Sequence, residues 1–343
     1  QIKKEVDEIK PLFISRKGIN PFLDVLTFFN YIQAILFHKP NMILLFTVKP
    51  VIYGSFAARI TKTNSISMIT GLGTAFIKNS WLTNFDKSLY KISLKDACTI
   101  FFQNKDDRNI FIENKLVKPE IGKIIPGSGI DLMKFKQTNL PENNNLIFLF
   151  VGRILKDKGI REYIEAAKII KKKYPNVRFQ ILGPIESENR TAIPINEIKQ
   201  WQEKKIIEYL GKTDNTSYYL NRASCIVLPS YREGTSRALL EAAAVGRPLI
   251  ASDVPGCKEI IIDEKSGFLC KVRDPIDLAN KISKKNKIPV FFIEKNQSHI
   301  IEEIKINVPK ALFPEMESNL SCPALVTALA SKLEEAVSID NGI

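Results

Sequence analysis

One stretch of this chain, residues 223–246, constrains its fold more than any other. An apolar run, 223–228, predicts a buried strand, which Pro229 ends. A small polar turn, 234–236, then opens a helix of alanine and leucine that Gly246 closes as its C-cap. Such a strand leading directly into a helix is typical of parallel α/β structure, and the helix N-terminus is a ready anion site.

Two charged residues, Arg237 and Glu241, lie inside this otherwise apolar helix, which we expect over Thr235–Val245. Such a helix should be largely buried, and a buried carboxylate needs a partner. The helix alone leaves two explanations open. Glu241 forms an i,i+4 ion pair with Arg237, or it accepts hydrogen bonds from the hydroxyl groups of a ligand.

Charge and histidine content narrow the classes of function. The 50 Lys and Arg residues against 37 Asp and Glu give a net charge of +13, and basic proteins meet nucleic acids, anionic membranes or phosphorylated ligands. No zinc-finger spacing or RNA motif is present, so we expect no nucleic-acid partner. Histidine occurs only at His38 and His299, which argues against a multi-histidine zinc site and a Ser-His-Asp triad. No apolar stretch of about 18 residues predicts a transmembrane helix.

Strands and helices alternate along almost the whole chain. The first series is expected to begin with a short strand at Pro11–Ser15 and the second with a strand at Leu146–Val151. Residues 137–145, rich in Asn and Pro, are the best candidate boundary between the two series. The alternation predicts an α/β protein with two doubly wound parallel sheets facing a cleft.

The predicted division has three parts. They are an incomplete N-terminal domain at 1–135, a C-terminal domain at 136–282 and a divergent tail at 283–343.

The loop Val151–Gly159 follows the first strand of the second series. There Gly152 lets backbone approach closely, and Arg153 and Lys158 precede a helix. These cations alone fit an ordinary solvated loop. However, the carboxyl ends of parallel strands share one sheet edge, so we expect the cations near Glu233 and the helix that follows it. Two cations beside a helix N-terminus suit a diphosphate.

The spacing Glu233-x7-Glu241 has a geometric meaning. Glu233 comes just before the helix, and Glu241 lies about five residues inside it, roughly 8 Å along the axis. The two carboxylates therefore flank the anion site at the separation of a sugar and a ribose. Carboxylates accept well from sugar hydroxyls.

Several motifs, taken together and in order, carry a family resemblance over roughly Ile9–Ile282. In the second half they are Val151-Gly152-Arg153 with Lys158-Gly159, Glu233-x7-Glu241, and Gly246-Arg247-Pro248 with Asp253-Val254-Pro255-Gly256. In the first half they are Thr47-Val48-Lys49-Pro50 with Tyr53-Gly54, Thr70-Gly71-Leu72-Gly73, Phe102-Gln103-Asn104, and Pro126-Gly127-Ser128-Gly129-Ile130-Asp131. The chain resembles the retaining glycosyltransferases of family 4, which have the GT-B fold of two Rossmann-like domains. The first half resembles a subgroup acting on bacterial surface polysaccharides and lipid-linked glycans.

The resemblance implies a role for each matching residue. The implied catalytic residues are Glu233, Arg153 and Lys158, with Glu233 at the transferred sugar and the two cations on the donor pyrophosphate. The implied donor-binding set is Gly152, Arg153, Lys158, Gly211, Glu233, Gly234, Thr235, Ser236 and Glu241. Within that set, the amides of residues 234–236 would bind the β-phosphate, and Glu241 would accept hydrogen bonds from the ribose hydroxyls. The segment Tyr209–Gly211 would lie at the edge of the nucleotide base. The acceptor-side candidates are Gly71, Gly73 and Ser128.

The implied chemistry needs no cofactor. We find no Asp-x-Asp motif, so we expect no metal, with the cations replacing it. The chain has no evident nucleophile that would explain retention of the anomeric configuration. This suggests that the acceptor attacks the face from which the leaving group departs, and that the leaving phosphate takes the acceptor's proton.

The expected activity is transfer of an N-acetylated hexosamine or related deoxy sugar from a UDP-sugar to a polyprenyl-diphosphate-linked saccharide. We expect the protein in the cytoplasm, on the inner face of the cell membrane. Phe22, Phe28, Phe29 and Lys39 could meet that membrane, although we expect the aromatic side chains to pack in the core.

The chain also departs from the family pattern. A Gly-Leu-Gly sequence, 71–73, stands where many members carry a histidine, so no histidine receives an acceptor role. The family's first strand and its glycine-rich turn should precede Ile9, and its closing helix is not recognisable after Ser283. The alternative function is therefore a catalytically impaired, non-enzymatic nucleotide-sugar-binding relative. A weaker alternative, another GT-B enzyme such as an epimerase, would need first-domain carboxylates and histidine that we do not find.

Overall fold

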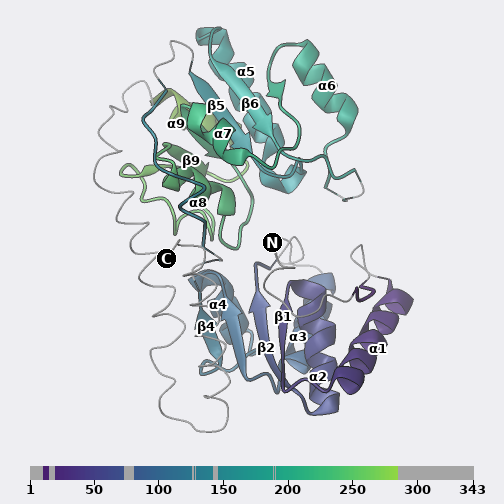
Figure 1. Ribbon diagram of the computed structural model, residues 1–343. Helices are drawn as coiled ribbons and strands as arrows, with labels where there is room; N and C mark the ends of the chain where they lie inside the picture. The colour runs from purple at the N-terminus through teal and green to yellow at the C-terminus, as the bar shows by residue number, and fades with distance from the viewer. Residues whose placement is uncertain are drawn as a thin grey trace. The chain divides into compact units, whose positions relative to one another are not determined.

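The computed structural model describes residues 11–14, 20–72, 81–125, 127, 129–141, 146–187, 189 and 191–284. The described residues divide into two compact units, one ending at Gly127 and the other beginning after it. Each unit is built on its own sheet, and every pairing between the named strands is parallel (Figure 1). The predicted fold class, two doubly wound α/β units, is confirmed.

The first unit carries a four-stranded sheet in the order β1-β2-β3-β4. The strands are β1 (Met42–Phe46), β2 (Asn64–Ile69), β3 (Thr99–Phe102) and β4 (Gly122–Ile124). The helices are α1 (Pro21–His38), the π-helix η2 (Pro50–Gly54), α2 (Ser55–Thr61), α3 (Trp81–Ser93) and α4 (Lys105–Glu113). The core of this unit includes a line of aromatic rings, in which Phe111 packs edge-on against Tyr90 and Phe102.

Local signals explain where the first helix of this unit begins and ends. The Asn20 side chain caps α1 by accepting hydrogen bonds from the Phe22 and Leu23 amides, and Pro21 occupies the first helical position. Lys39 then leaves the helix in the left-handed region, with φ at 45°. These signals, all of them local in the sequence, limit α1 to Pro21–His38.

The strand predicted at Pro11–Ser15 is wrong for the residues that the structure describes. Residues 11–14 form no strand, and the Phe13 side chain is exposed. A run this short gains little from its β propensity unless a neighbouring strand supplies the ladder.

The second unit carries a six-stranded sheet in the order β10-β9-β8-β5-β6-β7. Its strands are β5 (Ile147–Val151), β6 (Arg178–Leu182), β7 (Glu208–Tyr209), β8 (Cys225–Leu228), β9 (Leu249–Ser252) and β10 (Gly267–Cys270). Its helices are the short 3₁₀ helix η4 (Lys156–Lys158), α5 (Ile160–Lys173), α6 (Ile195–Glu203), α7 (Thr216–Arg222), α8 (Arg237–Ala244) and α9 (Pro275–Lys284). Strands β8 and β9 are buried along their whole length, as expected for strands covered on both faces.

Helix α8 ends as the sequence predicts but begins later. Gly246, at φ +78°, closes a Schellman motif in which its amide and that of Arg247 donate to the Ala243 and Ala242 carbonyls. The predicted start at Thr235 is wrong by two residues, because Ser236 is the N-cap and Arg237 the first helical residue. Both Thr235 and Ser236 are favourable caps, and the sequence does not distinguish them.

Candidate functional site

The residues predicted to bind a donor are brought together at one edge of the second unit's sheet. Strands β5 and β8 are neighbours, and the chain continues from β5 to β6 on one side and from β8 to β9 on the other. Because these strands are parallel, the loops after β5 and β8 meet at this point where the strand order reverses. Open α/β sheets bind ligands at such switch points.

Two glycines allow the loops at this edge to pack closely against one another. Gly159 has φ +73°, and a Cβ there would lie 2.0 Å from the Pro229 carbonyl oxygen. Gly256 has φ +78°, and its Cβ would lie 2.2 Å from the Gly234 carbonyl oxygen. Any side chain would force these loops apart, so the loops after β5, β8 and β9 pack backbone against backbone.

Gly152 takes part in a third close approach, but it is not the residue that permits it. A Cβ on Gly183, which follows β6, would lie 1.8 Å from the Gly152 carbonyl oxygen. A Cβ on Gly152 would meet only the Phe150 ring, at 3.5 Å. The requirement for glycine therefore lies at Gly183, which the sequence analysis missed.

Lys158 and Glu233 form an ion pair across the switch point. The Lys158 Nζ atom lies 2.6 Å from Glu233 Oε1, and the two side chains are 17% and 11% exposed. One residue ends η4 after β5, and the other belongs to the loop after β8. A contact this short between largely buried groups is a charge-assisted hydrogen bond, which fixes both side chains at the sheet edge.

Arg153 is placed differently from Lys158. Its Nη1 atom lies 3.3 Å from Glu186 Oε2, and both side chains are substantially exposed to solvent. Exposed pairs of this kind contribute little to stability, so the Arg153 guanidinium can exchange Glu186 for an anionic ligand at low cost.

The N-terminus of α8 is organised by its own cap. The Ser236 hydroxyl accepts from the Leu239 amide, and the Ser236 amide donates to the Gly256 carbonyl oxygen at 3.2 Å. The loop that leads into this helix is held by the Tyr231 amide, which donates to the Asp157 carbonyl oxygen. The helix dipole therefore points its positive end at the switch point.

Glu241 is buried on the second turn of α8. It is 8% exposed, and its Oε1 atom accepts a hydrogen bond of 2.9 Å from Arg237 Nε. Burial raises the pKa of the Glu241 carboxyl, against the opposing effects of Arg237 and Lys134. The ion-pair explanation from the sequence is thus confirmed, and Lys134 is a neighbouring cation that the sequence analysis missed.

Gly211 belongs to the segment Tyr209–Gly211, which the family resemblance implies beside the nucleotide base. It has φ +78°, and a Cβ added there would meet no atom within 4 Å. Its carbonyl oxygen accepts from the Gly183 amide, and the Tyr209 hydroxyl donates to the Gly183 carbonyl oxygen. The end of β7 is therefore joined to the end of β6 at the same sheet edge as Gly152.

Arg247, which belongs to one of the matching motifs, is fully buried. Its Nε atom donates to the Leu220 carbonyl oxygen, and its Nη2 atom contacts Thr138 and the Asn139 carbonyl oxygen. Burial lowers the pKa of this guanidinium to about 10. Arg247 therefore acts as a structural cation that joins residues 138–139 to the end of α7.

Of the acceptor-side candidates, only Gly71 lies within the residues that the structure describes. It follows β2 in the first unit and has φ +128°. Gly73 and Ser128 lie outside the described residues. Within the described ranges, no group of three or more Asp, Glu, His or Cys side chains gathers as a metal site.

Family models match both halves of the sequence. Residues 133–307, just over half of the chain, match the model described as glycosyl transferases group 1, and residues 5–104 match one described as glycosyl transferase 4-like. The chain belongs to the group 1 glycosyl transferases. The longer match contains every predicted donor-site residue from Gly152 to Glu241, so this glycosyltransferase carries its candidate site within the family domain.

Three of its relatives are named bacterial glycosyltransferases. It is 29% identical to N,N'-diacetylbacillosaminyl-diphospho-undecaprenol alpha-1,3-N-acetylgalactosaminyltransferase of Campylobacter jejuni, over 78% of this chain and 74% of that protein. It is 28% identical to the capsular polysaccharide biosynthesis glycosyltransferase CapM of Staphylococcus aureus, over 83% and 77%. It is 25% identical to UDP-Gal:alpha-D-GlcNAc-diphosphoundecaprenol alpha-1,3-galactosyltransferase of Escherichia coli, over 78% and 72%.

Solved structures show the same fold. Sucrose-phosphate synthase from Thermosynechococcus elongatus matches with a TM-score of 0.70 at 19% identity, over 94% of this chain and 81% of that one. Anabaena HepE in complex with UDP and glucose matches with a TM-score of 0.67 at 17% identity, over 95% and 85%. The fold of this glycosyltransferase is GT-B.

Proposed function

We propose that this glycosyltransferase moves a sugar from a UDP-activated donor to a polyprenyl-diphosphate-linked saccharide, in the synthesis of a bacterial surface polysaccharide or glycan. The names of the C. jejuni and E. coli relatives both specify a diphospho-undecaprenol acceptor, and the E. coli name also specifies a UDP-sugar. We propose an N-acetylated hexosamine or a related deoxy sugar as the group transferred.

The contact between Lys158 and Glu233 is the observation that carries this proposal. The Lys158 ammonium has three hydrogens, and one of them is directed to Glu233 Oε1 at 2.6 Å. Another can donate to a donor phosphate oxygen, while the second oxygen of Glu233 can accept from a sugar hydroxyl. One fixed pair at the switch point thus offers a contact to each side of the bond that must break.

The charges at this edge are complementary to those that develop during the reaction. When the glycosyl–phosphate bond breaks, its electron pair stays on the leaving diphosphate and positive charge grows at the anomeric carbon. Lys158, Arg153 and the N-terminus of α8 would stabilise the leaving group. We propose that these groups act without a metal ion. The acceptor hydroxyl then attacks the face from which the diphosphate leaves and gives its proton to it, so the anomeric configuration is retained.

Glu241 is proposed to accept the ribose hydroxyls of the donor. Its ion pair with Arg237 is compatible with this role, because a carboxylate has about four acceptor sites and Arg237 Nε uses one of them. Helix α8 would then contact the donor at both ends of the diphosphate, through its N-terminus and through its second turn.

The test is a calorimetric titration of UDP, without added metal, into the wild type and Glu241→Ala. We expect the variant to bind UDP more weakly by about 1–3 kcal/mol, because a buried hydrogen bond to ribose is lost. Glu165→Ala is the matched control, since Glu165 is an exposed carboxylate of α5 that pairs with Lys168, three residues further along the same helix. Its UDP affinity should equal that of the wild type.

Transfer itself is tested with Lys158→Met and a lipid-linked acceptor. We expect a loss of at least about 100-fold in turnover, the cost of removing one group that stabilises leaving-group charge. Folded wild-type protein that binds no UDP would contradict the donor site. UDP binding without transfer would instead favour a non-enzymatic nucleotide-sugar-binding relative.

A further inference from the structure

Another side-chain contact joins the two segments that carry Lys158 and Glu233. The Tyr231 hydroxyl donates to Glu162 Oε1 at 2.7 Å. Glu162 lies in the first turn of α5, four residues after Lys158, and Tyr231 lies two residues before Glu233. Both contacts therefore run between the segment that follows β5 and the segment that follows β8, at the switch point of the sheet.

The Glu162 carboxylate relies on the Tyr231 hydroxyl. Its other oxygen, Oε2, is buried and has no hydrogen-bond partner among the residues that the structure describes. Burial, and after it the hydrogen bond and charge of Glu162, raise the pKa of the Tyr231 phenol to about 12. The phenol is therefore protonated at neutral pH and acts as the donor, and its loss would leave a buried acceptor unsatisfied.

A third element contacts the ring of Tyr231. The Arg273 guanidinium lies over this ring, 4.5 Å from its centroid. Arg273 has φ +59° and lies in the turn between β10 and α9, where Asp274 accepts from the Ile276 and Asp277 amides. Helix α9 packs against α5, so the Tyr231 side chain is contacted from both of these neighbouring parts of the unit.

Tyr231 is joined to the segment after β5 at two points. Its hydroxyl contacts Glu162, and its amide donates to the Asp157 carbonyl oxygen at 2.9 Å. These two partners lie on either side of Lys158 in the sequence. A residue held through both its backbone and the end of its side chain has a fixed orientation, and Glu233 follows it by only two residues.

We propose that Tyr231 is a positioning residue, whose hydrogen bond to Glu162 keeps the Lys158–Glu233 pair where Lys158 meets the donor diphosphate. This inference rests on the proposed function, because it explains how the donor site is held. Tyr231 acts through Lys158 and does not touch the donor. Stabilisation of the leaving group depends on preorganised charges, so a small displacement of Lys158 weakens both binding and transfer.

The test measures the effect of Tyr231→Phe on UDP affinity in two backgrounds, the wild type and Lys158→Met, by calorimetry without added metal. Lys158→Met itself should bind UDP at least about tenfold more weakly, since a charge-assisted hydrogen bond is lost. In the wild type, Tyr231→Phe should weaken binding about three- to tenfold, because one anchoring hydrogen bond is removed and the ring stays. In Lys158→Met it should have no further effect, because no ammonium remains to be positioned.

Variants of α5 provide the controls. Glu162→Gln keeps an acceptor for the Tyr231 hydroxyl and should bind UDP as the wild type does, whereas Glu162→Leu should reproduce Tyr231→Phe. Tyr163→Phe is the matched control, because Tyr163 is the next residue of the helix and is fully buried. Its hydroxyl lies 2.7 Å from the Phe148 carbonyl oxygen and 3.0 Å from that of Gln180. Its loss should lower stability and leave UDP affinity unchanged.

Two results would overturn this proposal alone. One is wild-type UDP affinity in folded Tyr231→Phe and Glu162→Leu, and the other is an equal loss of affinity from Tyr231→Phe in both backgrounds, which indicates a structural role. Circular dichroism establishes that each variant is folded. Failure of the proposed function gives a different pattern. A wild type that binds no UDP, or Lys158→Met with wild-type affinity, would refute the donor site and this inference with it.

Discussion

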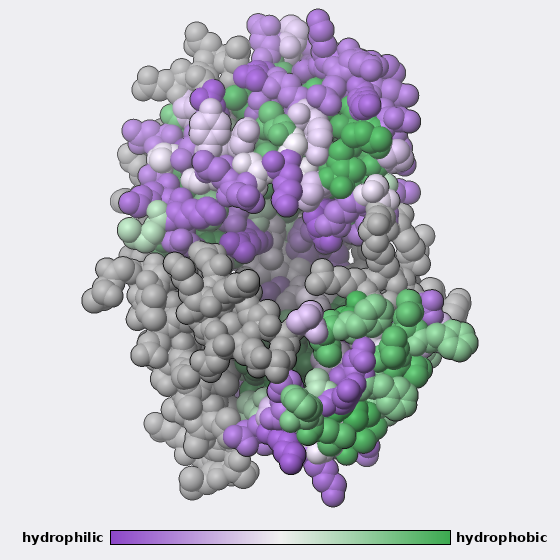
Figure 2. All heavy atoms as spheres, turned by 45° about the vertical axis from the view of Figure 1, so that its right-hand side comes forward, coloured by the Kyte–Doolittle hydropathy of each residue, from purple (hydrophilic) through white to green (hydrophobic). Residues whose placement is uncertain are grey.

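Helices α1 and α8 each bury one carboxylate beside one cation. The other buried side chains of α8 are apolar, whereas α1 buries mainly polar ones. In α8 the apolar residues Leu239 and Leu240 are buried, and Glu241 is the polar exception among them. In α1 the polar residues Asp24 and Thr27 are buried together with Ile35, and most of the large apolar side chains are exposed (Figure 2). The two ion pairs have similar lengths, 2.9 Å for Glu241 with Arg237 and 2.6 Å for Asp24 with Lys49.

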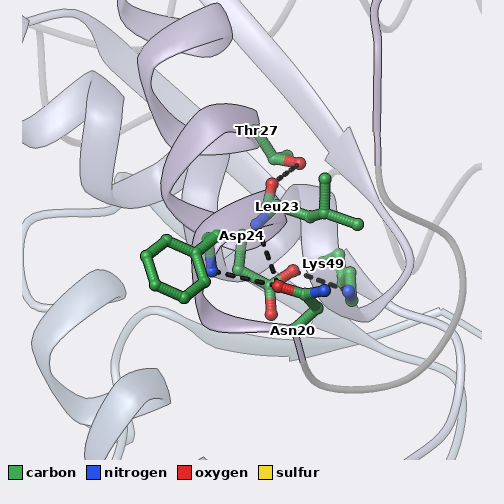
Figure 3. A network of polar contacts seen from close by, with 6 residues as sticks. Asn20, Leu23, Asp24, Thr27 and Lys49 are labelled. Carbon is green, nitrogen blue, oxygen red and sulfur yellow. Dashed lines mark hydrogen bonds and ion pairs between the residues drawn. The ribbon is translucent and has the colours of Figure 1, made fainter.

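This contrast separates two uses of a buried carboxylate. The core already accounts for the apolar face of α8, so Glu241 is the feature left to explain, and the proposed role at the donor ribose is our explanation for it. In α1 the carboxylate is explained by its structural partner Lys49 (Figure 3), so the exposed apolar side chains of this helix are the feature left to explain.

The largest expected effect comes from truncating a leucine in each helix. Leu239→Ala should lower the free energy of unfolding of the second unit by about 2–5 kcal/mol, because Leu239 is fully buried in α8. Leu36→Ala should change that of the first unit by less than about 0.5 kcal/mol, because Leu36 is exposed on α1. Urea denaturation followed by circular dichroism measures both. A large loss at Leu36 would contradict the inverted orientation of α1.

The second-largest expected effect is a difference in stability between the neutral analogues of the two carboxylates. Asp24→Asn should cost the first unit about 1–3 kcal/mol, because it removes the charge from a short, buried hydrogen bond with Lys49. Glu241→Gln should cost the second unit less than about 0.5 kcal/mol or stabilise it, because burial disfavours the ionised carboxyl there. Thermal denaturation of both variants at neutral pH provides the comparison, and equal losses would remove the distinction between the two sites.

The sequence predicted the helices and strands best where local signals bound them. The limits of α1 follow from Asn20, Pro21 and Pro40, which act on the backbone regardless of what the helix packs against. Helices α6 and α7 were missed because each is short and mostly polar. Their position depends on packing against the sheet more than on propensity.

The site and the orientation of α1 depend on tertiary structure that periodicity does not encode. Lys158 and Glu233 are 75 residues apart, and their contact requires β5 and β8 to be neighbours. Periodicity places Phe22 and Phe29 on one face of α1 but does not say which face turns inward. The expectation that these two rings pack in the core was therefore wrong, whereas Phe28 is half-buried and stacks on Phe56 at 5.1 Å between centroids.

The smallest expected effect is a pH dependence at Glu241 that should act in opposite directions on stability and on binding. Burial raises the pKa of this carboxyl above its ordinary value of 4.5, so the folded protein favours the protonated form more than the unfolded chain does. Its contribution to stability is full below pH 4.5 and is lost as the pH rises through the raised pKa. The wild type should therefore lose stability relative to Glu241→Gln as the pH rises from 4.5 toward neutrality.

Binding of UDP should change the other way in the same pH range, because the ionised carboxylate is the better acceptor for ribose hydroxyls. The ratio of wild-type to Glu241→Gln affinity should rise with pH, and taking the ratio cancels the titration of UDP itself. Unfolding midpoints and calorimetric titrations of the two proteins across this range measure both trends. A flat affinity ratio beside a changing stability difference would leave Glu241 as a structural residue of α8, in the same class as Asp24 in α1.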